Sequence, residues 1–344
     1  MSIEEWRQCM EKRYDYVDVI KGIAMIFIYL GHWTTQYITG FAYLFHLQCF
    51  FLVSGFFANK QTRRSVKEWG KRNFVKLLVP YFVWVVVSFV FNNLDNAELS
   101  LNDFKKIFME PNSIQPNYWF FPSIIAIITC YYFLRKILSE KFIVILAFFL
   151  YLLFGENPII SCTHNFLYNS DSWPVLIRVI NNWIAFSSIP QYLFWYSLGS
   201  VAFPYVNRFR EIRNDSYSEF KIISGVLGLL SVVLLFKGSA IQNRIGCEQL
   251  WGGYKACCAI IIISFVISLS ILFENSNVLR NIGESSMNFM GLEFITHGWF
   301  TLSFLPMINL GIPSINSTIQ VIMVVAIQIF ITLLISNWIN RCKL

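Results

Sequence analysis

Three ionisable side chains, Asp18, Lys21 and His32, lie in the first long apolar segment of the chain. At ~100° per helical residue, the step from Lys21 to His32 comes to about 20° past three full turns, and Asp18 lies three residues before Lys21. The three groups therefore share one helix face, with Lys21 and His32 roughly 16 Å apart along the axis. Because charge inside an apolar span is costly, this alignment predicts a functional site. A histidine suits general-base work on a hydroxyl.

Each member of this set also has a purely structural explanation. Asp18 and Lys21 are spaced to form an ion pair between neighbouring turns at the start of a helix. His32 could be a hydrogen-bonded interior histidine without chemistry. The alignment of all three groups favours the functional interpretation for His32.

The composition predicts an integral membrane protein. Of the 344 residues, 56% are hydrophobic and 14% are charged, and the mean hydropathy is +0.54. A soluble domain carries about 25% charged residues. No polar stretch is long enough for a separate soluble domain, so we expect a single membrane domain over residues 1–344. Residues 1–16 do not resemble a cleaved signal peptide, so we expect the first apolar segment to remain as a span.

Apolar runs near the ~20 residues that cross a bilayer can be placed ten times. With both termini cytoplasmic, this count puts most of the 27 Lys and Arg residues on the cytoplasmic side, as the positive-inside rule requires. We therefore predict an all-α, polytopic transmembrane bundle in the cell inner or plasma membrane. The predicted spans are 17–37, 41–58, 77–93, 119–138, 142–156, 183–204, 221–237, 256–273, 286–304 and 316–338.

The remaining patterns exclude several classes of protein. The net charge of +7 follows from basic cytoplasmic loops, and no nucleic-acid-binding motif accompanies it. The eight cysteines form no metal-like spacing with histidine, and no phosphate-binding glycine loop is present. We therefore expect a protein without a bound metal and without a nucleic-acid partner.

Three histidines are predicted to lie at one depth. If the turn between the first two spans is centred near Thr39, then His32 and His46 are equally far from it and lie at the same level, in the outer half of the bilayer. His297 has a comparable depth in span nine. Glu293 lies four residues before His297 on the same helix face, where it could orient or neutralise that imidazole. A structural role for His46 and His297 remains as plausible as a functional one.

An ordered set of motifs resembles the acyltransferase-3 family of multi-span membrane acyltransferases, and within it the branch that O-acetylates sugars, such as fucose 4-O-acetylase-like proteins. That family carries a basic residue, ten intervening residues and a histidine in its first span, matched by Lys21 and His32, with Asp18 three residues before. The other matching segments are Phe45–Phe57 with its Ser54-Gly55-Phe56, Val79-Pro80-Tyr81, Asn117–Phe121 and Gly283–His297.

The resemblance implies a reaction and its substrates. Family members generally move an acyl group, usually acetyl, from cytoplasmic acyl-CoA to a carbohydrate hydroxyl. Acetyl-CoA would be the donor substrate, with no permanently bound cofactor, and the acceptor would be a cell-surface polysaccharide or a lipid-linked precursor. The family also carries an Arg-x-x-Arg pair tied to activity, for which Arg210 and Arg213 qualify. Paired guanidinium donors suit CoA phosphates, although ordinary positive-inside charge explains the pair equally well.

These implications give each residue an expected role. His32 would deprotonate the acceptor hydroxyl, while Lys21 and Asp18 would position the donor or tune the histidine. A covalent acyl-histidine relay is an alternative route. Supporting roles are expected for His46, Ser54, Glu293 and His297.

Two other classes of protein remain open. A transporter or flippase for a lipid-linked sugar would also use many spans with interior charges, although the chain has no repeated halves or paired broken helices. A membrane receptor or scaffold without chemistry is the third interpretation. The long outer loops 94–118 and 157–182 could contact a sugar, or could be ordinary connections.

Overall fold

The computed structural model describes residues 14–33, 36–93, 105, 109, 116–155, 174–245, 251–304 and 318–342. Their regular structure is entirely helical, which confirms the predicted all-α class. In chain order the helices are α2 (Asp15–Trp33), α3 (Gln36–Tyr43), α4 (His46–Gly55), α5 (Ala58–Thr62), α6 (Val66–Asn92), η1 (Pro116–Trp119), α9 (Phe120–Ile137), α10 (Glu140–Phe154), α12 (Val175–Ile184), η3 (Phe186–Ser188), α13 (Ile189–Asp215), α14 (Tyr217–Ile245), α15 (Trp251–Leu272), α16 (Asn277–Glu284), α17 (Ser286–Trp299), η5 (Phe300–Phe304) and α19 (Thr318–Arg341).

Each of the ten predicted spans overlaps one to three of these helices, but not every helix is long enough to cross a membrane alone. Six helices have the length and apolar composition of a span, which supports a membrane protein. These six lie in Asp15–Trp33, Val66–Phe91, Phe120–Ile137, Tyr217–Phe236, Gly252–Leu272 and Gln320–Arg341.

The other four predicted spans differ from a simple membrane helix. The second is broken at Leu44 and Phe45, whose amides make tight three-residue turn bonds to Phe41 and Ala42. The helices α10 and α17 have 15 and 14 residues, and α13 begins later than predicted, at Ile189. The count of ten spans and the cytoplasmic termini therefore stay predictions. The predicted loops 94–118 and 157–182 lie largely outside the described residues.

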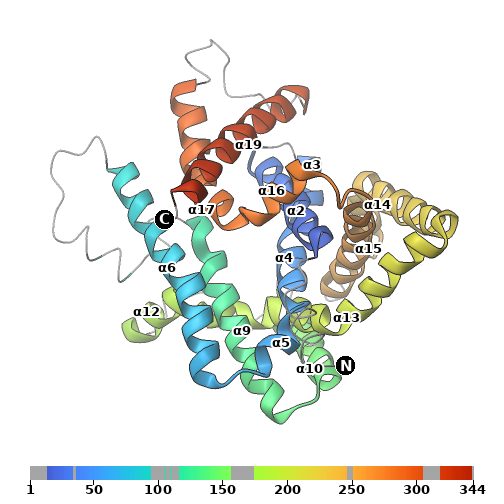
Figure 1. Cartoon of the computed structure of the whole chain (residues 1–344), viewed down its shortest axis with the longest axis horizontal. Helices are drawn as coiled ribbons and strands as arrows, with labels where there is room; N and C mark the ends of the chain where they lie inside the picture. Colours follow the sequence, from blue (N-terminus) through green and yellow to red (C-terminus); the bar gives the residue numbers. More distant parts are fainter. Residues whose placement is uncertain are drawn as a thin grey trace.

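Helices α2 and α4 lie near the middle of the bundle (Figure 1), with α17 and α19 on one side and α14 and α15 on another. Helix α2 packs against α16, α4, α15 and α19, so its polar face is enclosed by other helices. In contrast, α6, α14 and α19 expose large apolar side chains, such as Val79 at 55%, Leu229 at 67% and Met323 at 60%. Apolar surfaces of this kind suit contact with lipid.

The start of α2 packs backbone to backbone against α16. A Cβ atom added at Gly283 would overlap the carbonyl of Asp18, and one at Gly22 would overlap the carbonyl of Leu279. Only glycine permits such an approach, since any side chain would force the two helices apart. The glycine of the Gly283–His297 motif thus holds α16 against the turn that carries Asp18 and Lys21.

We expect Gly283→Ala to destabilise the protein by about 1–3 kcal/mol, the usual cost of overpacking. The measurement is the midpoint of thermal unfolding in detergent, together with the amount of protein in membranes. Gly225→Ala on α14 is the matched control, because a Cβ there meets nothing within 4 Å. Equal stability of the two variants would contradict the backbone contact.

Candidate active site

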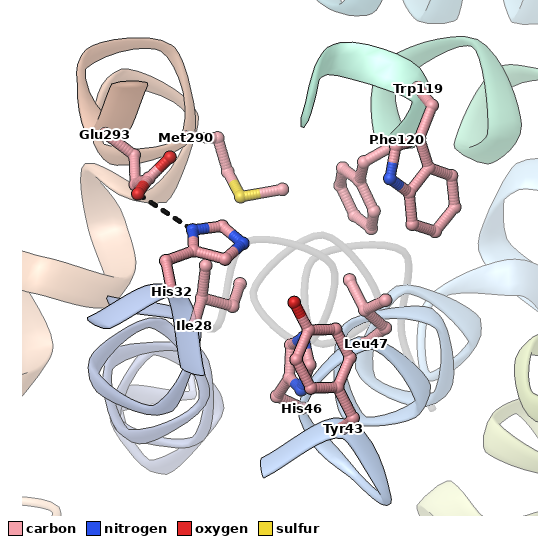
Figure 2. Close-up of a pocket in the computed structure, with 9 residues that line it drawn as sticks. All are labelled: Ile28, His32, Tyr43, His46, Leu47, Trp119, Phe120, Met290 and Glu293. Carbon is pink, nitrogen blue, oxygen red and sulfur yellow. Dashed lines mark hydrogen bonds and ion pairs between the residues drawn. The ribbon is translucent and has the colours of Figure 1, made fainter. Parts of the chain in front are cut away.

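A cavity of about 100 Å³ lies between α2, α3, α4, α17 and the start of α9, and its residues are shown in Figure 2. The structure brings His32 and His46 to this one cavity, although they come from different helices. The cavity combines polar and apolar walls. Its lining residues are Ile28, His32, Tyr43, His46, Leu47, Trp119, Phe120, Met290 and Glu293.

Glu293 is paired with His32. Its Oε1 lies 2.8 Å from His32 Nδ1, and the glutamate is only 3% exposed. A carboxylate can only accept here, so Nδ1 carries the proton and Nε2 of the neutral ring keeps its lone pair. Figure 2 shows the dashed contact on one side of the imidazole and the cavity on the other. A carboxylate behind a histidine fixes its tautomer and stabilises the imidazolium, as in hydrolase triads.

A buried amide from α19 holds the histidine and the glutamate helices together. Gln328 Nε2 donates to the Glu293 carbonyl at 3.3 Å and to Thr296 Oγ1 at 2.9 Å. Trp33 Nε1, one residue after His32, donates to Gln328 Oε1 at 2.5 Å. These bonds connect α2, α17 and α19, so the spacing between His32 and Glu293 is set by packed, hydrogen-bonded helices.

His46 has a different environment from His32. Its Nδ1 donates to the carbonyl of Ala42, 2.5 Å away, and the residue is 3% exposed. Because a carbonyl only accepts, the proton lies on Nδ1 and Nε2 has the lone pair. The Tyr43 ring packs edge-on against the imidazole, with centroids 5.1 Å apart. The described residues show no carboxylate contact for His46, so it lacks the partner that would stabilise a positive charge.

Glu293 has a partner that its spacing within α17 did not suggest. Its carboxylate lies 2.8 Å from Nδ1 of His32, on a different helix. The His297 ring instead packs on Trp33, with centroids 4.2 Å apart, and it does not line the cavity. In addition, Thr39 lies inside helix α3 and is not the centre of a turn. His32 and His46 still line one cavity, and the chain turns at Leu44 and Phe45, between α3 and α4.

Lys21 and Asp18 form an ion pair of their own away from the cavity. Lys21 Nζ lies 3.1 Å from Asp18 Oδ1, and Asp18 is 7% exposed. Neither residue lines the cavity at His32, as expected from their distance from His32 along α2. Ser54 also lies outside that cavity, eight residues after His46 on α4.

Arg210 and Arg213 share one carboxylate that the sequence analysis did not identify. Arg210 Nε lies 2.9 Å from Glu274 Oε2, and an Arg213 terminal nitrogen lies 2.5 Å from Oε1. The Arg210 guanidinium also lies over the Tyr16 ring at 5.7 Å. This arrangement links the end of α13 to the segment after α15. A phosphate bound here would have to share the guanidinium groups with Glu274.

The fold and the cavity together define a helical membrane protein with a carboxylate-backed histidine in its interior. A family model described as an acyltransferase domain, that of the acyltransferase-3 family, matches residues 14–341. The chain therefore belongs to this family and is a membrane acyltransferase. No curated protein and no solved structure matches it. Within the described residues, no group of three or more His, Cys, Asp or Glu is placed to hold a metal ion.

Proposed function

We propose that this protein is an O-acetyltransferase that moves acetyl from cytoplasmic acetyl-CoA to a hydroxyl of a cell-surface polysaccharide or its lipid-linked precursor. Membership of the family supports acyl transfer. The observation that carries the proposal is the pairing of His32 with Glu293 at the wall of a cavity. We also propose that all ten predicted segments cross the inner or plasma membrane, with both termini cytoplasmic.

In this mechanism His32 is the general base. Its Nε2 takes the proton of the acceptor hydroxyl while the hydroxyl oxygen attacks the thioester carbon. The bond between carbon and sulfur then breaks, and the CoA thiolate takes the proton from the imidazolium, which returns His32 to its neutral form. Glu293 stabilises the imidazolium between these two steps, because its carboxylate accepts from Nδ1.

The size and walls of the cavity support a short acyl group. Its volume of about 100 Å³ is smaller than the ~150 Å³ of an engineered cavity that holds benzene. Ile28, Leu47 and Met290 provide apolar contacts for a methyl group beside the two histidines. Trp119 and Tyr43 add aromatic faces with polar edges, which suit the mixed apolar and hydroxyl surface of a sugar.

His46 supports a second route for the same reaction. Its unprotonated Nε2 could attack the thioester carbon and release CoA as the thiolate, which leaves a positively charged acyl-imidazolium on His46. The acceptor hydroxyl would then attack the acyl carbon while His32 takes its proton, His46 would leave as neutral imidazole, and the proton on His32 would pass to the thiolate. This relay differs from direct transfer in one observable. Label from acetyl-CoA would remain on wild-type protein when acceptor is withheld, and would be absent from the His46→Ala variant.

For the donor, we propose that CoA phosphates bind the guanidinium nitrogens of Arg210 and Arg213 that do not contact Glu274. Lys21 would lie between these two arginines and His32, and its positive charge would attract the anionic donor.

The test supplies acetyl-labelled acetyl-CoA to membranes with and without the protein, followed by mass spectrometry of surface glycans and lipid-linked sugars. We expect label in a sugar ester only when the protein is present. Movement of unmodified sugar lipid without labelling would support a transporter instead. Absence of both label and movement would support a receptor or scaffold.

We expect Lys21→Arg to keep most of the activity and Lys21→Ala to lose most of it, because only the former retains the charge. A purely structural ion pair predicts the same pattern for these two variants, since the alanine removes the Lys21 ammonium from beside the buried Asp18 carboxylate and the arginine does not. The double variant Asp18→Asn with Lys21→Gln separates the two roles. Recovery of activity in the double variant would mean that the lysine serves only to neutralise Asp18.

A further inference from the structure

The first turns of α6 carry a cluster of positive charge that the acyl-transfer site does not use. Lys71, Arg72 and Lys76 line an open cavity of about 370 Å³, together with Glu68 and Val75. Three positively charged side chains and one carboxylate therefore line this cavity. All five residues belong to the segment from Glu68 to Lys76 of one helix, α6, which is among the six helices with the properties of a membrane span.

Within the part of the chain that the structure describes, Glu68 offsets only part of this charge, so the cluster stays net positive. There, no salt bridge involves Lys71, Arg72 or Lys76, whereas Arg210 and Arg213 both reach Glu274. Arg64, just before α6, adds a further cation. Burial, followed by the charge of Arg72, lowers the pKa of Arg64 below its ordinary value. Cations that repel one another in this way are stabilised by a bound anion.

An apolar stripe continues from the cations along the outer surface of α6. Val75, Val79 and Val83 follow Lys71 at intervals of four residues, and so lie on one helix face. Their exposed fractions are 55%, 55% and 49%. A bound molecule that fits both parts has an anionic group at the cations and a hydrocarbon chain along the valines.

We propose that the start of α6 is a binding site for an anionic phospholipid, with its headgroup phosphate at Lys71, Arg72 and Lys76 and an acyl chain along Val75, Val79 and Val83. Arginine and lysine bind phosphate oxygens through charge-assisted hydrogen bonds. Basic clusters beside a span are attracted to anionic lipids of the cytoplasmic leaflet, the side on which the proposed topology places this end of α6. A soluble phosphate compound would use the cations and leave the valine stripe without a ligand.

The test measures lipid binding to the full-length protein in detergent by native mass spectrometry. Phosphatidylglycerol and phosphatidylcholine with identical acyl chains are compared, so that only the headgroup charge differs. We expect phosphatidylglycerol to bind at least fivefold more tightly, and the double variant Arg72→Gln, Lys76→Gln to lose this preference. Lys221→Gln is the matched control, since Lys221 begins another lipid-facing helix, α14, but lies over the Tyr217 ring at 4.3 Å. We expect this control to keep the preference.

Three results would overturn the proposal. The first is equal binding of the two lipids, and the second is an unchanged preference in the double variant. The third is displacement of phosphatidylglycerol by equimolar glycerol phosphate or acetyl-CoA, which would assign the cations to a soluble phosphate. If the double variant unfolds, Lys71→Gln with Lys76→Gln provides the same comparison with Arg72 in place. None of these readouts depends on acyl transfer.

Discussion

Replacing His32 by alanine is expected to lower acetyl transfer by about 10²–10⁴-fold, the usual contribution of a positioned general base. The imidazole is the only titratable ring at this cavity that the described residues pair with a carboxylate, through the 2.8 Å contact to Glu293. Without the His32 imidazole, the acceptor hydroxyl has no base whose protonated form is stabilised by a carboxylate. The measurement is the rate of label transfer from acetyl-CoA in membranes that contain equal amounts of each protein.

His297→Gln provides a comparison within the same layer of the protein. His297 packs on Trp33 but does not line the cavity, so we expect its loss to lower the rate by less than about fivefold. If the His32→Ala variant transfers acetyl at the wild-type rate, His32 is not the base. If the two variants lose equal activity, the role of His32 is structural.

The helices could be predicted well from the sequence because long apolar segments leave few alternatives in a membrane. The break between α3 and α4 could not. Residues 41–58 are mostly apolar, and the chain turns at Leu44 and Phe45, where the Phe45 ring packs against Phe27 and Phe41 at centroid distances of 5.0 and 5.5 Å. Hydropathy does not distinguish such a turn from a continuous span.

The site was predicted in part. The expected depths of His32 and His46 brought these two residues together, but the spacing within one helix did not point to His32 as a partner of Glu293. The angle at which α17 crosses α2 decides that contact, and a single sequence does not contain it. Likewise, Glu274 lies 61 residues from Arg213, so no local pattern pointed to their ion pair.

One missed signal was present in the sequence. Gln328, Thr332 and Ser336 follow one another at intervals of four residues in an apolar helix, and all three are fully buried. Polar residues in such a register mark the face of a membrane helix that packs against other helices. On this face, Gln328 donates a hydrogen bond to the Glu293 carbonyl, and Thr332 accepts one from Tyr29 of α2.

Glu293→Gln is expected to lower kcat by about 10²–10⁴-fold and to leave the KM for acetyl-CoA nearly unchanged. In a serine protease, the corresponding change from carboxylate to amide reduces kcat by about 10⁴-fold, because the amide favours the wrong histidine tautomer. A glutamine amide that donates to His32 Nδ1 would likewise move the ring proton to Nε2, where it blocks proton abstraction. The glutamine also fails to stabilise the imidazolium. Label transfer measured over a range of acetyl-CoA concentrations separates kcat from KM.

Protein stability distinguishes this positioning role from a structural one. The carboxylate is 3% exposed, so its replacement by a neutral amide of the same shape removes a buried charge and should not lower the unfolding midpoint. Glu284→Gln on α16 is the matched control, because that carboxylate lies near the half-buried Arg280 and outside the cavity. We expect the control to keep its rate. If the Glu293→Gln variant unfolds at a lower temperature and loses activity in proportion, Glu293 is a structural residue. If the variant is stable and its rate is normal, Glu293 has no part in the mechanism and His32 acts without a carboxylate.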